Sequence, residues 1–118
     1  MAPTFKKDEK LKSRKIIGQL FEEGKTVRKY PLKLFFLPIP TLKNHQAAFA
    51  VPKRSFKRAV TRNRIKRQLR EAYRLQKEIP TAHKDPYFAL LFLYIGKEKT
   101  TYRQIEKAVA VLLKKLTA

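Results

Sequence analysis

The sequence predicts an α+β fold, a single-domain two-layer α/β sandwich in which helices cover a mixed sheet. Three features lead to this prediction: a basic amphipathic stretch at 53–74, a continuous apolar run at 87–95 and a C-terminal apolar stripe of helical period. With 118 residues, 43% of them hydrophobic, the chain is long enough for one core and too short for two. We therefore treat 1–118 as one domain, in which residues 1–10 are expected to be flexible.

The first predicted element is a short packing helix that is capped by Ser13 and ends at Gly24. Ser13 has a side chain suited to an N-cap, and Gly24 suits a left-handed residue after the last turn. One apolar stripe is expected along this helix. It comprises Ile16, Ile17, Leu20 and Phe21.

Two or three strands are expected before the basic stretch and one after it. Residues 30–37 are rich in Leu, Phe and Tyr, which favours a strand with Lys33 beside Phe35 on its second face. Residues 46–51 are small and apolar, as suits a strand within a sheet. Residues 87–95 are too continuously apolar to face water on either side, so they are expected to form the central strand.

The rest of the chain completes the order of elements. Residues 78–86 contain two prolines and are expected to form a loop. Thr101 and Gln104 have the spacing of a capping box, which predicts the start of the last helix. The predicted order is α-β-β-(β)-α-β-α.

The basic stretch is the candidate functional segment. Residues 53–74 hold ten of the 29 lysines and arginines and a single acid, Glu71. The helical face expected to be buried consists of Ile65, Leu69, Ala72 and Tyr73. The opposite face consists of Asn63, Lys66, Arg67, Arg70 and Arg74. One face is therefore expected to pack on the core and the other to bind an anion.

Nucleic acid is the leading candidate for this anion. Arginines three and four residues apart repel one another by a few tenths of a kcal/mol per pair, so a partner outside the chain is expected to compensate. The planar guanidinium also matches phosphate oxygens and base edges better than an ammonium does. A net charge of +20 suits a large RNA. A simply solvated helix face and a structural ribosomal or rRNA-binding protein remain alternatives, and a membrane-active cationic protein is less favoured.

The basic stretch contains the run Ala-Val-Thr-Arg-Asn-Arg-Ile-Lys-Arg at 59–67, followed by Leu-Arg-Glu-Ala-Tyr at 69–73. With the preceding strand at 47–51, this run resembles the signature helix of the bacterial ribonuclease P protein subunit. The helix end at 20–24 and the strand at 32–35 match the family's order, so the resemblance covers nearly the full length. It implies a left-handed βαβ crossover around the signature helix, against the usual rule.

One segment departs from the family pattern. The family enters the signature helix through a short basic turn that contains glycine, whereas residues 53–58 are one residue longer and contain none. The shape of this turn is therefore left open.

The resemblance also implies a function. The chain is expected to be the protein subunit of an endoribonuclease that removes the 5′ leader from precursor tRNA, with the catalytic RNA subunit and precursor tRNA as partners and no obligatory protein partner. In the family the RNA holds the active site and uses divalent ions, here Mg²⁺, so no catalytic or metal-binding residue is expected in the protein. A chain without cysteine or an apolar leader is expected in the cytoplasm, and no membrane partner is expected.

Two sets of binding residues are expected. Those for the catalytic RNA are Lys53, Arg54, Arg58, Arg62, Asn63, Arg64, Lys66, Arg67 and Arg70. Those for the leader cleft, by resemblance, are Ile17, Phe21, Lys33 and Phe35. Rings interleaved with cations suit a single strand, because bases stack on rings while cations follow the backbone. Core packing is the alternative role for both phenylalanines.

Several side chains carry more specific expectations. Arg62 lies near the apolar side of the helix, so it should either precede the regular helix or pack its stem and leave its guanidinium free. Asn63 is expected to make a directed hydrogen bond, to RNA or to the first turn of its own helix. His45 and His83 are placed in turns without a catalytic partner, and the acids show no metal-ligand spacing.

Overall fold

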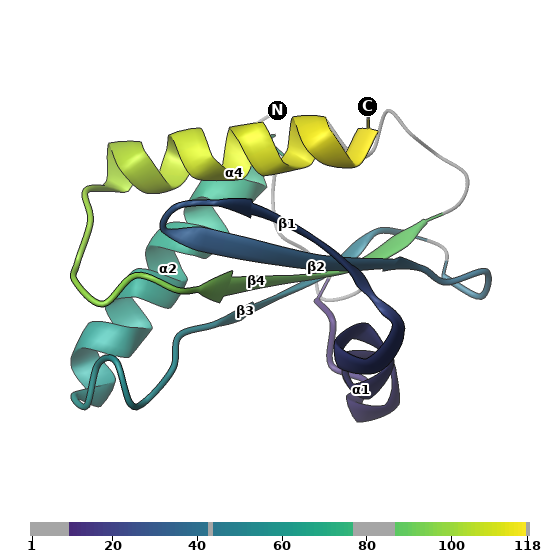
Figure 1. Ribbon diagram of the computed structural model, residues 1–118, viewed down its shortest axis with the longest axis horizontal. Helices are drawn as coiled ribbons and strands as arrows, with labels where there is room; N and C mark the ends of the chain where they lie inside the picture. Colours follow the sequence, from purple (N-terminus) through teal and green to yellow (C-terminus); the bar gives the residue numbers. More distant parts are fainter. Residues whose placement is uncertain (1–9, 43, 77–86, 118) are drawn as a thin grey trace.

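The computed structural model describes residues 10–42, 44–76 and 87–117. The predicted order of elements is confirmed, with a third strand before the basic helix (Figure 1). The elements are α1 (Arg14–Glu23), β1 (Lys25–Lys29), β2 (Leu32–Pro38), β3 (Gln46–Ala50), α2 (Ala59–Gln76), β4 (Phe88–Tyr94) and α4 (Tyr102–Thr117).

The strands form one mixed sheet in the order β1-β2-β4-β3. Strand β2 is antiparallel to both β1 and β4, whereas β3 is parallel to β4, so α2 lies within a βαβ connection. Strand β4 is an interior strand and is buried except at Leu93, which confirms the prediction for the apolar run. The left hand of the crossover stays a prediction.

Helices α2 and α4 cover one face of the sheet and form the second layer of the sandwich (Figure 1). The alternate residues of β2 and β4 that point to this side are packed against them, because successive side chains of a strand point to opposite faces. The buried residues of α2 are Ile65, Leu69, Ala72 and Tyr73, as predicted from the helical period. This layer therefore holds the main core.

Helix α1 lies against one end of the opposite face of the sheet (Figure 1). Its buried Leu20 packs with Ala89 and Leu91 of β4, while Phe35 of β2 is partly buried against the same cluster. By alternation along β2, Lys33 also faces this side. The face therefore has an apolar end under α1 and a lysine beyond it.

Of the two predictions for the ends of α1, the one for the N-cap is confirmed and the one for Gly24 is wrong. Ser13 is the N-cap as predicted, because its Oγ accepts the N–H of Ile16 at 3.3 Å. The prediction of a left-handed Gly24 is wrong: its φ and ψ are −66° and 148°, which is extended backbone. The glycine is needed for a different reason, since an added Cβ would collide with the backbone carbonyl oxygen of Leu20. The same carbonyl accepts the Gly24 N–H at 3.0 Å.

Other local predictions are tested by hydrogen bonds. The capping box is present, because Thr101 N–H donates to Gln104 Oε1 at 3.1 Å and Gln104 N–H donates to Thr101 Oγ1 at 3.2 Å. His45 lies just before β3, where it is buried and its Nδ1 accepts the backbone N–H of Phe88 at 2.9 Å. The strand expected at 30–37 begins later, at Leu32.

Three predictions lie wholly or mostly outside the described residues. They concern the loop at 78–86, His83 within it, and residues 1–9 of the segment expected to be flexible. Lys10, the last residue of that segment, forms a parallel β-bridge with Ala47.

Candidate nucleic-acid interface

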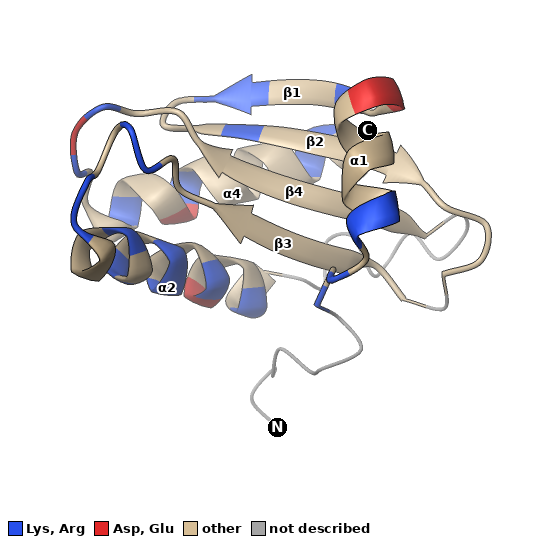
Figure 2. Cartoon of the chain, turned by 90° about the horizontal axis from the view of Figure 1, so that it is seen from below, with Lys and Arg blue, Asp and Glu red and all other residues tan. Residues whose placement is uncertain are grey.

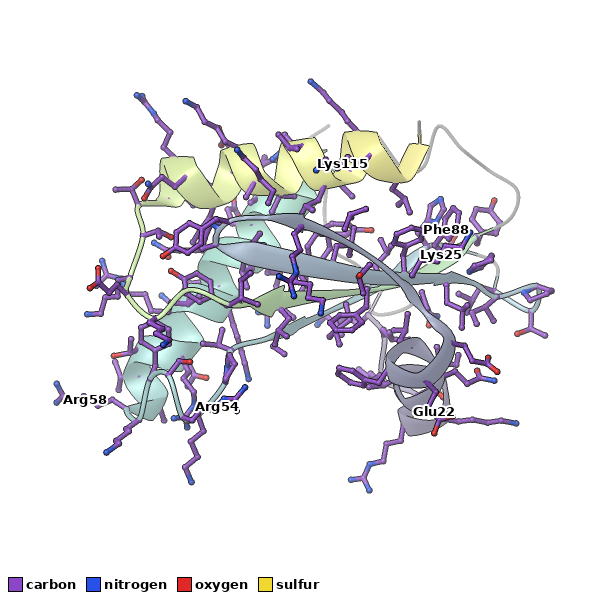
Figure 3. The ribbon with its side chains drawn as sticks, in the orientation of Figure 1. Glu22, Lys25, Arg54, Arg58, Phe88 and Lys115 are labelled. Carbon is purple, nitrogen blue, oxygen red and sulfur yellow. The ribbon has the colours of Figure 1, made fainter. Side chains whose placement is uncertain are left out.

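Helix α2 and the loop before it form a basic surface, as Figure 2 shows by the blue segments along both. In Figure 3, Arg54 and Arg58 project from this loop away from the sheet. The side chains of the basic surface are exposed except for Lys66, which is half-buried. They are Lys53, Arg54, Arg58, Arg64, Lys66, Arg67 and Arg70.

The charge of this surface is not compensated within the described part of the chain. There, Arg64, Arg67 and Arg70 make no ion pair with a carboxylate. Glu71, the one acid of α2, pairs instead with Arg74, whose Nε donates to Glu71 Oε2 at 3.0 Å. The hydrogen bond from the Arg74 guanidinium holds the pKa of the Glu71 carboxyl below its ordinary value of 4.5. Arg74 is thus partnered within α2, whereas the arginines of the basic surface are not.

The turn that enters α2 needs no glycine. The Pro52 carbonyl accepts the N–H groups of Ser55 and Phe56 at 3.2 and 3.3 Å. The Phe56 ring packs against Tyr94, with the ring centroids 5.6 Å apart. None of the described residues has a positive φ, so the left-handed conformation that favours glycine is not used here. The turn at 53–58, whose shape the sequence left open, therefore forms without the glycine that the family has there.

The prediction that Arg62 either precedes the helix or leaves its guanidinium free is wrong. Arg62 lies within α2, and its guanidinium is not free: Nη1 donates to the carbonyl oxygens of Phe56 and Lys57, each at 2.8 Å. Two of the five N–H donors of the guanidinium therefore hold the turn in place. Arg62 holds the loop that carries the other cations.

Asn63 is exposed and lies in the second turn of α2, which begins at Ala59. Its side chain makes no hydrogen bond to another described residue, so the local cap that was one of its two expected roles is not formed. A directed bond to RNA stays a prediction.

The four residues predicted for the cleft come together from α1 and β2. The rings of Phe21 and Phe35 meet edge to face, with centroids 5.0 Å apart and planes at 62°. The Nζ of Lys33 lies 4.9 Å from the Phe35 centroid. Phe21 is 56% exposed, whereas Phe35 and Ile17 are half-buried against the cluster under α1. The arrangement is an aromatic pair, exposed at Phe21, with a cation beside Phe35.

A depression of about 590 Å³ lies near this cleft, between the loop before α2 and the end of β4. Arg54, Lys97 and Leu93 line it, and Leu93 is the cross-strand partner of Lys33. Lys97, which lines this depression, is not among the predicted binding residues, because a lysine in a polar turn has no periodic pattern that distinguishes it from other surface lysines.

Metal ligands do not gather in the described residues: no group of three or more His, Cys, Asp or Glu side chains is close enough to hold an ion. No helix in the same residues has the length and apolar character that crossing a membrane requires.

Comparisons with known proteins identify the family of this chain. The family model for Ribonuclease P matches residues 5–117. The chain is 35% identical over 117 residues to the ribonuclease P protein component of Porphyromonas gingivalis strain W83, covering 91% of this chain and 83% of that protein. It is 29% identical over 116 residues to that of Petrotoga mobilis, covering 98% and 97%.

Solved structures show the same fold. The RNase P protein of Staphylococcus aureus matches with a TM-score of 0.77 and 18% identity, covering 92% of this chain and 94% of that chain. The RNase P protein of Thermotoga maritima matches with a TM-score of 0.75 and 21% identity, covering 91% and 96%. With the family model matching nearly the whole length, the chain belongs to the ribonuclease P protein family.

Proposed function

We propose that this chain is the protein component of a ribonuclease P holoenzyme, the endoribonuclease that removes the 5′ leader from precursor tRNA. The observation that carries the proposal is the presence of two different surfaces on opposite sides of one sheet. The basic surface lies on α2, and the Phe21–Phe35 pair, which belongs to the predicted cleft, lies between α1 and β2. Family membership favours this function over a structural ribosomal protein.

The basic surface is the proposed docking site for the catalytic RNA. Its arginines have no carboxylate partner among the described residues, so phosphates can compensate their mutual repulsion without first breaking an ion pair. Their guanidinium groups can bind phosphate oxygens through two parallel hydrogen bonds. The loop from Lys53 to Arg58 belongs to the same surface, because Arg62 fixes it to the start of α2.

The aromatic cleft is the proposed site for the single-stranded leader. Phe21 exposes more than half of its surface next to the ring of Phe35, which is the environment in which a base can stack. Lys33 lies beside these rings and can neutralise a backbone phosphate. Because the leader is held on one face and the catalytic RNA on the other, the protein can position the two RNAs relative to each other.

The chemistry of cleavage belongs to the RNA in this proposal. When bound, Mg²⁺ would activate water for the cleavage, and in this proposal it would be held mainly by the catalytic RNA. The protein contributes by reducing the repulsion between two polyanions and by fixing the position of the scissile bond. A cytoplasmic location stays a prediction.

Reconstitution with the catalytic RNA tests this function. We expect the chain to accelerate 5′-leader cleavage and Arg64→Ala with Arg67→Ala to weaken its affinity for that RNA. A matched control is Arg103→Ala with Lys107→Ala, which removes the same charge from the exposed side of α4. Circular dichroism checks that each variant is folded.

The outcomes separate the two surfaces. Loss of affinity in the α2 variant, with leader-length discrimination retained at saturating protein, supports the division of labour. Equal affinities of the α2 and α4 variants would show that α2 does not dock on the catalytic RNA, and an unchanged cleavage rate on adding the wild-type protein would contradict the function itself.

A further inference from the structure

Beside the edge strand β3 lies a groove of about 280 Å³, here called the β3 groove. Its floor is Ala47–Phe49, one wall carries Lys10 and Lys12, and the other carries Lys66 and Arg70 of α2. We propose that the β3 groove binds the phosphodiester backbone of a single strand of the catalytic RNA. This extends the basic surface across the N-terminal segment, and it rests on the proposed function.

The N-terminal wall is fixed by its backbone. Leu11 N–H donates to the Ala47 carbonyl at 2.9 Å, and Lys10 forms a parallel β-bridge with the same residue. Leu11 is buried beneath α1, with 5% of its surface exposed. In an extended segment, residues on either side of a buried one point the opposite way, so Lys10 and Lys12 share the outer side. Both are exposed.

The described residues that line the β3 groove carry charges of one sign. Among them are four cations and no carboxylate. Lys66 and Arg70 are four residues apart on α2, which places them about 6 Å apart along the helix axis, so they can bind successive phosphates of one strand. The N-terminal lysines approach the same space from the other side. A polyanion in the β3 groove would meet cations on both walls.

The floor of the β3 groove indicates that the backbone, not the bases, is bound. Phe49 is the single aromatic among the described residues that line the β3 groove, and its ring is stacked on Phe92, with centroids 5.5 Å apart and planes at 17°. The same ring also meets Tyr73 edge to face. The Phe49 ring is therefore half-buried against the core and offers less surface to a base than the 56% exposed Phe21 does. Recognition in the β3 groove is electrostatic and independent of sequence.

The test measures binding of the full chain to the catalytic RNA without tRNA, over a range of salt concentrations. The groove variant is Lys10→Gln with Lys12→Gln. The control is Lys29→Gln with Lys107→Gln, which removes two exposed lysines elsewhere. If each groove lysine neutralises one phosphate, the slope of log K against log salt should become shallower by about 1.4 to 1.8. The corresponding loss of affinity at 0.15 M salt is roughly 10- to 30-fold.

The possible results are distinct. A larger change in slope for the groove pair than for the control pair supports the β3 groove, and an equal change would overturn it, because overall charge would then explain both. If the groove pair changes leader-length discrimination instead of affinity for the catalytic RNA, the strand is the leader and the assignment is wrong. If Arg64→Ala with Arg67→Ala also leaves affinity for the catalytic RNA unchanged, the proposed docking on α2 fails together with the β3 groove.

A second measurement locates the strand directly. The chain contains no cysteine, so Lys12→Cys gives a single attachment point for a probe that generates hydroxyl radicals. We expect cleavage of the catalytic RNA in one short single-stranded stretch. Cleavage spread evenly over the RNA would contradict a defined strand in the β3 groove.

Discussion

Two arginines of the same sequence run have different roles because of where their side chains end. The guanidinium of Arg62 reaches back to the carbonyls of Phe56 and Lys57, whereas Arg64 is exposed and has no carboxylate partner among the described residues. The first maintains the shape of the loop, and the second is available to RNA. Charge alone would not distinguish them.

Arg62→Ala should therefore reduce stability, in addition to any effect on RNA affinity. Two bonds from a charged donor to backbone carbonyls are lost, which is expected to lower the free energy of unfolding by about 1 to 3 kcal/mol. Arg64→Ala is the control and should change it by no more than about 0.5 kcal/mol. Urea unfolding measures both, and equal stabilities of the two variants would contradict the role of Arg62.

Tyr94 gives a prediction for alkaline pH. Its hydroxyl donates to the Glu98 carbonyl at 2.6 Å, and burial raises its pKa above the ordinary value of 10.0. The fold thus favours the neutral phenol, so this contribution to stability is complete below pH 10.0 and is lost as the pH rises through the folded-state pKa. Between pH 9 and 11 the unfolding free energy of the wild type should fall more steeply than that of Tyr94→Phe. Parallel curves would show that Tyr94 does not contribute.

At the scale of elements, the cleft depends on how α1 docks on the sheet. Leu20 anchors the helix at the apolar end of the face, and this brings Phe21, the next residue, to the ring of Phe35. The proposed cleft therefore takes its residues from two elements that are separated in sequence by β1.

Phe21→Ala should weaken binding of precursor tRNA with a long leader by about 1 to 3 kcal/mol, the value of one stacked base. Because Phe21 is mostly exposed, the variant should keep its fold better than Phe35→Ala, in which a half-buried ring is removed. The measurement compares holoenzyme affinity for substrates with a long and a one-nucleotide leader. An equal loss on both would mean that the ring only supports α1.

Predictions from the sequence succeeded where a strong hydrophobic pattern determined the structure. The stripe of α2 was predicted residue by residue, and the apolar run of β4 could only be an interior strand. Strand β1 could not be placed, because Val27 is its single apolar residue between exposed lysines, arginine and threonine, as is common for edge strands. Gly24 was assigned to the helix end correctly, but for a wrong reason, since the close approach of Leu20 is a three-dimensional fact.

The candidate site was predictable to a similar extent. The cations of α2 follow from composition, and the cleft residues follow from the resemblance to the family. The hydrogen bonds of Arg62 and the presence of the β3 groove could not be predicted, because they depend on contacts between segments. Lys10 lies far from Lys66 in sequence, and only the bridge to Ala47 brings its segment to α2.

At the scale of the whole molecule, the net charge of +20 governs association. With roughly six to ten phosphate contacts, the affinity for the catalytic RNA should fall about 10³- to 10⁵-fold between 50 and 200 mM salt. A titration of binding against salt concentration measures this slope. A nearly flat response would mean that base contacts or apolar contacts, not counterion release, dominate the free energy of binding.

The position of β4 also determines the order in which this protein can assemble. The strand lies between β2 and β3, yet it is synthesised after both of them and after α2, so the sheet cannot close until most of the chain has been made. Pairings between residues far apart in sequence form slowly. Until they form, the apolar stripe of α2 lacks its partner strand while its cations are already able to attract RNA. Because a ligand that prefers the folded state shifts the equilibrium toward it, the RNA partner should act as a folding aid as well as a binding partner.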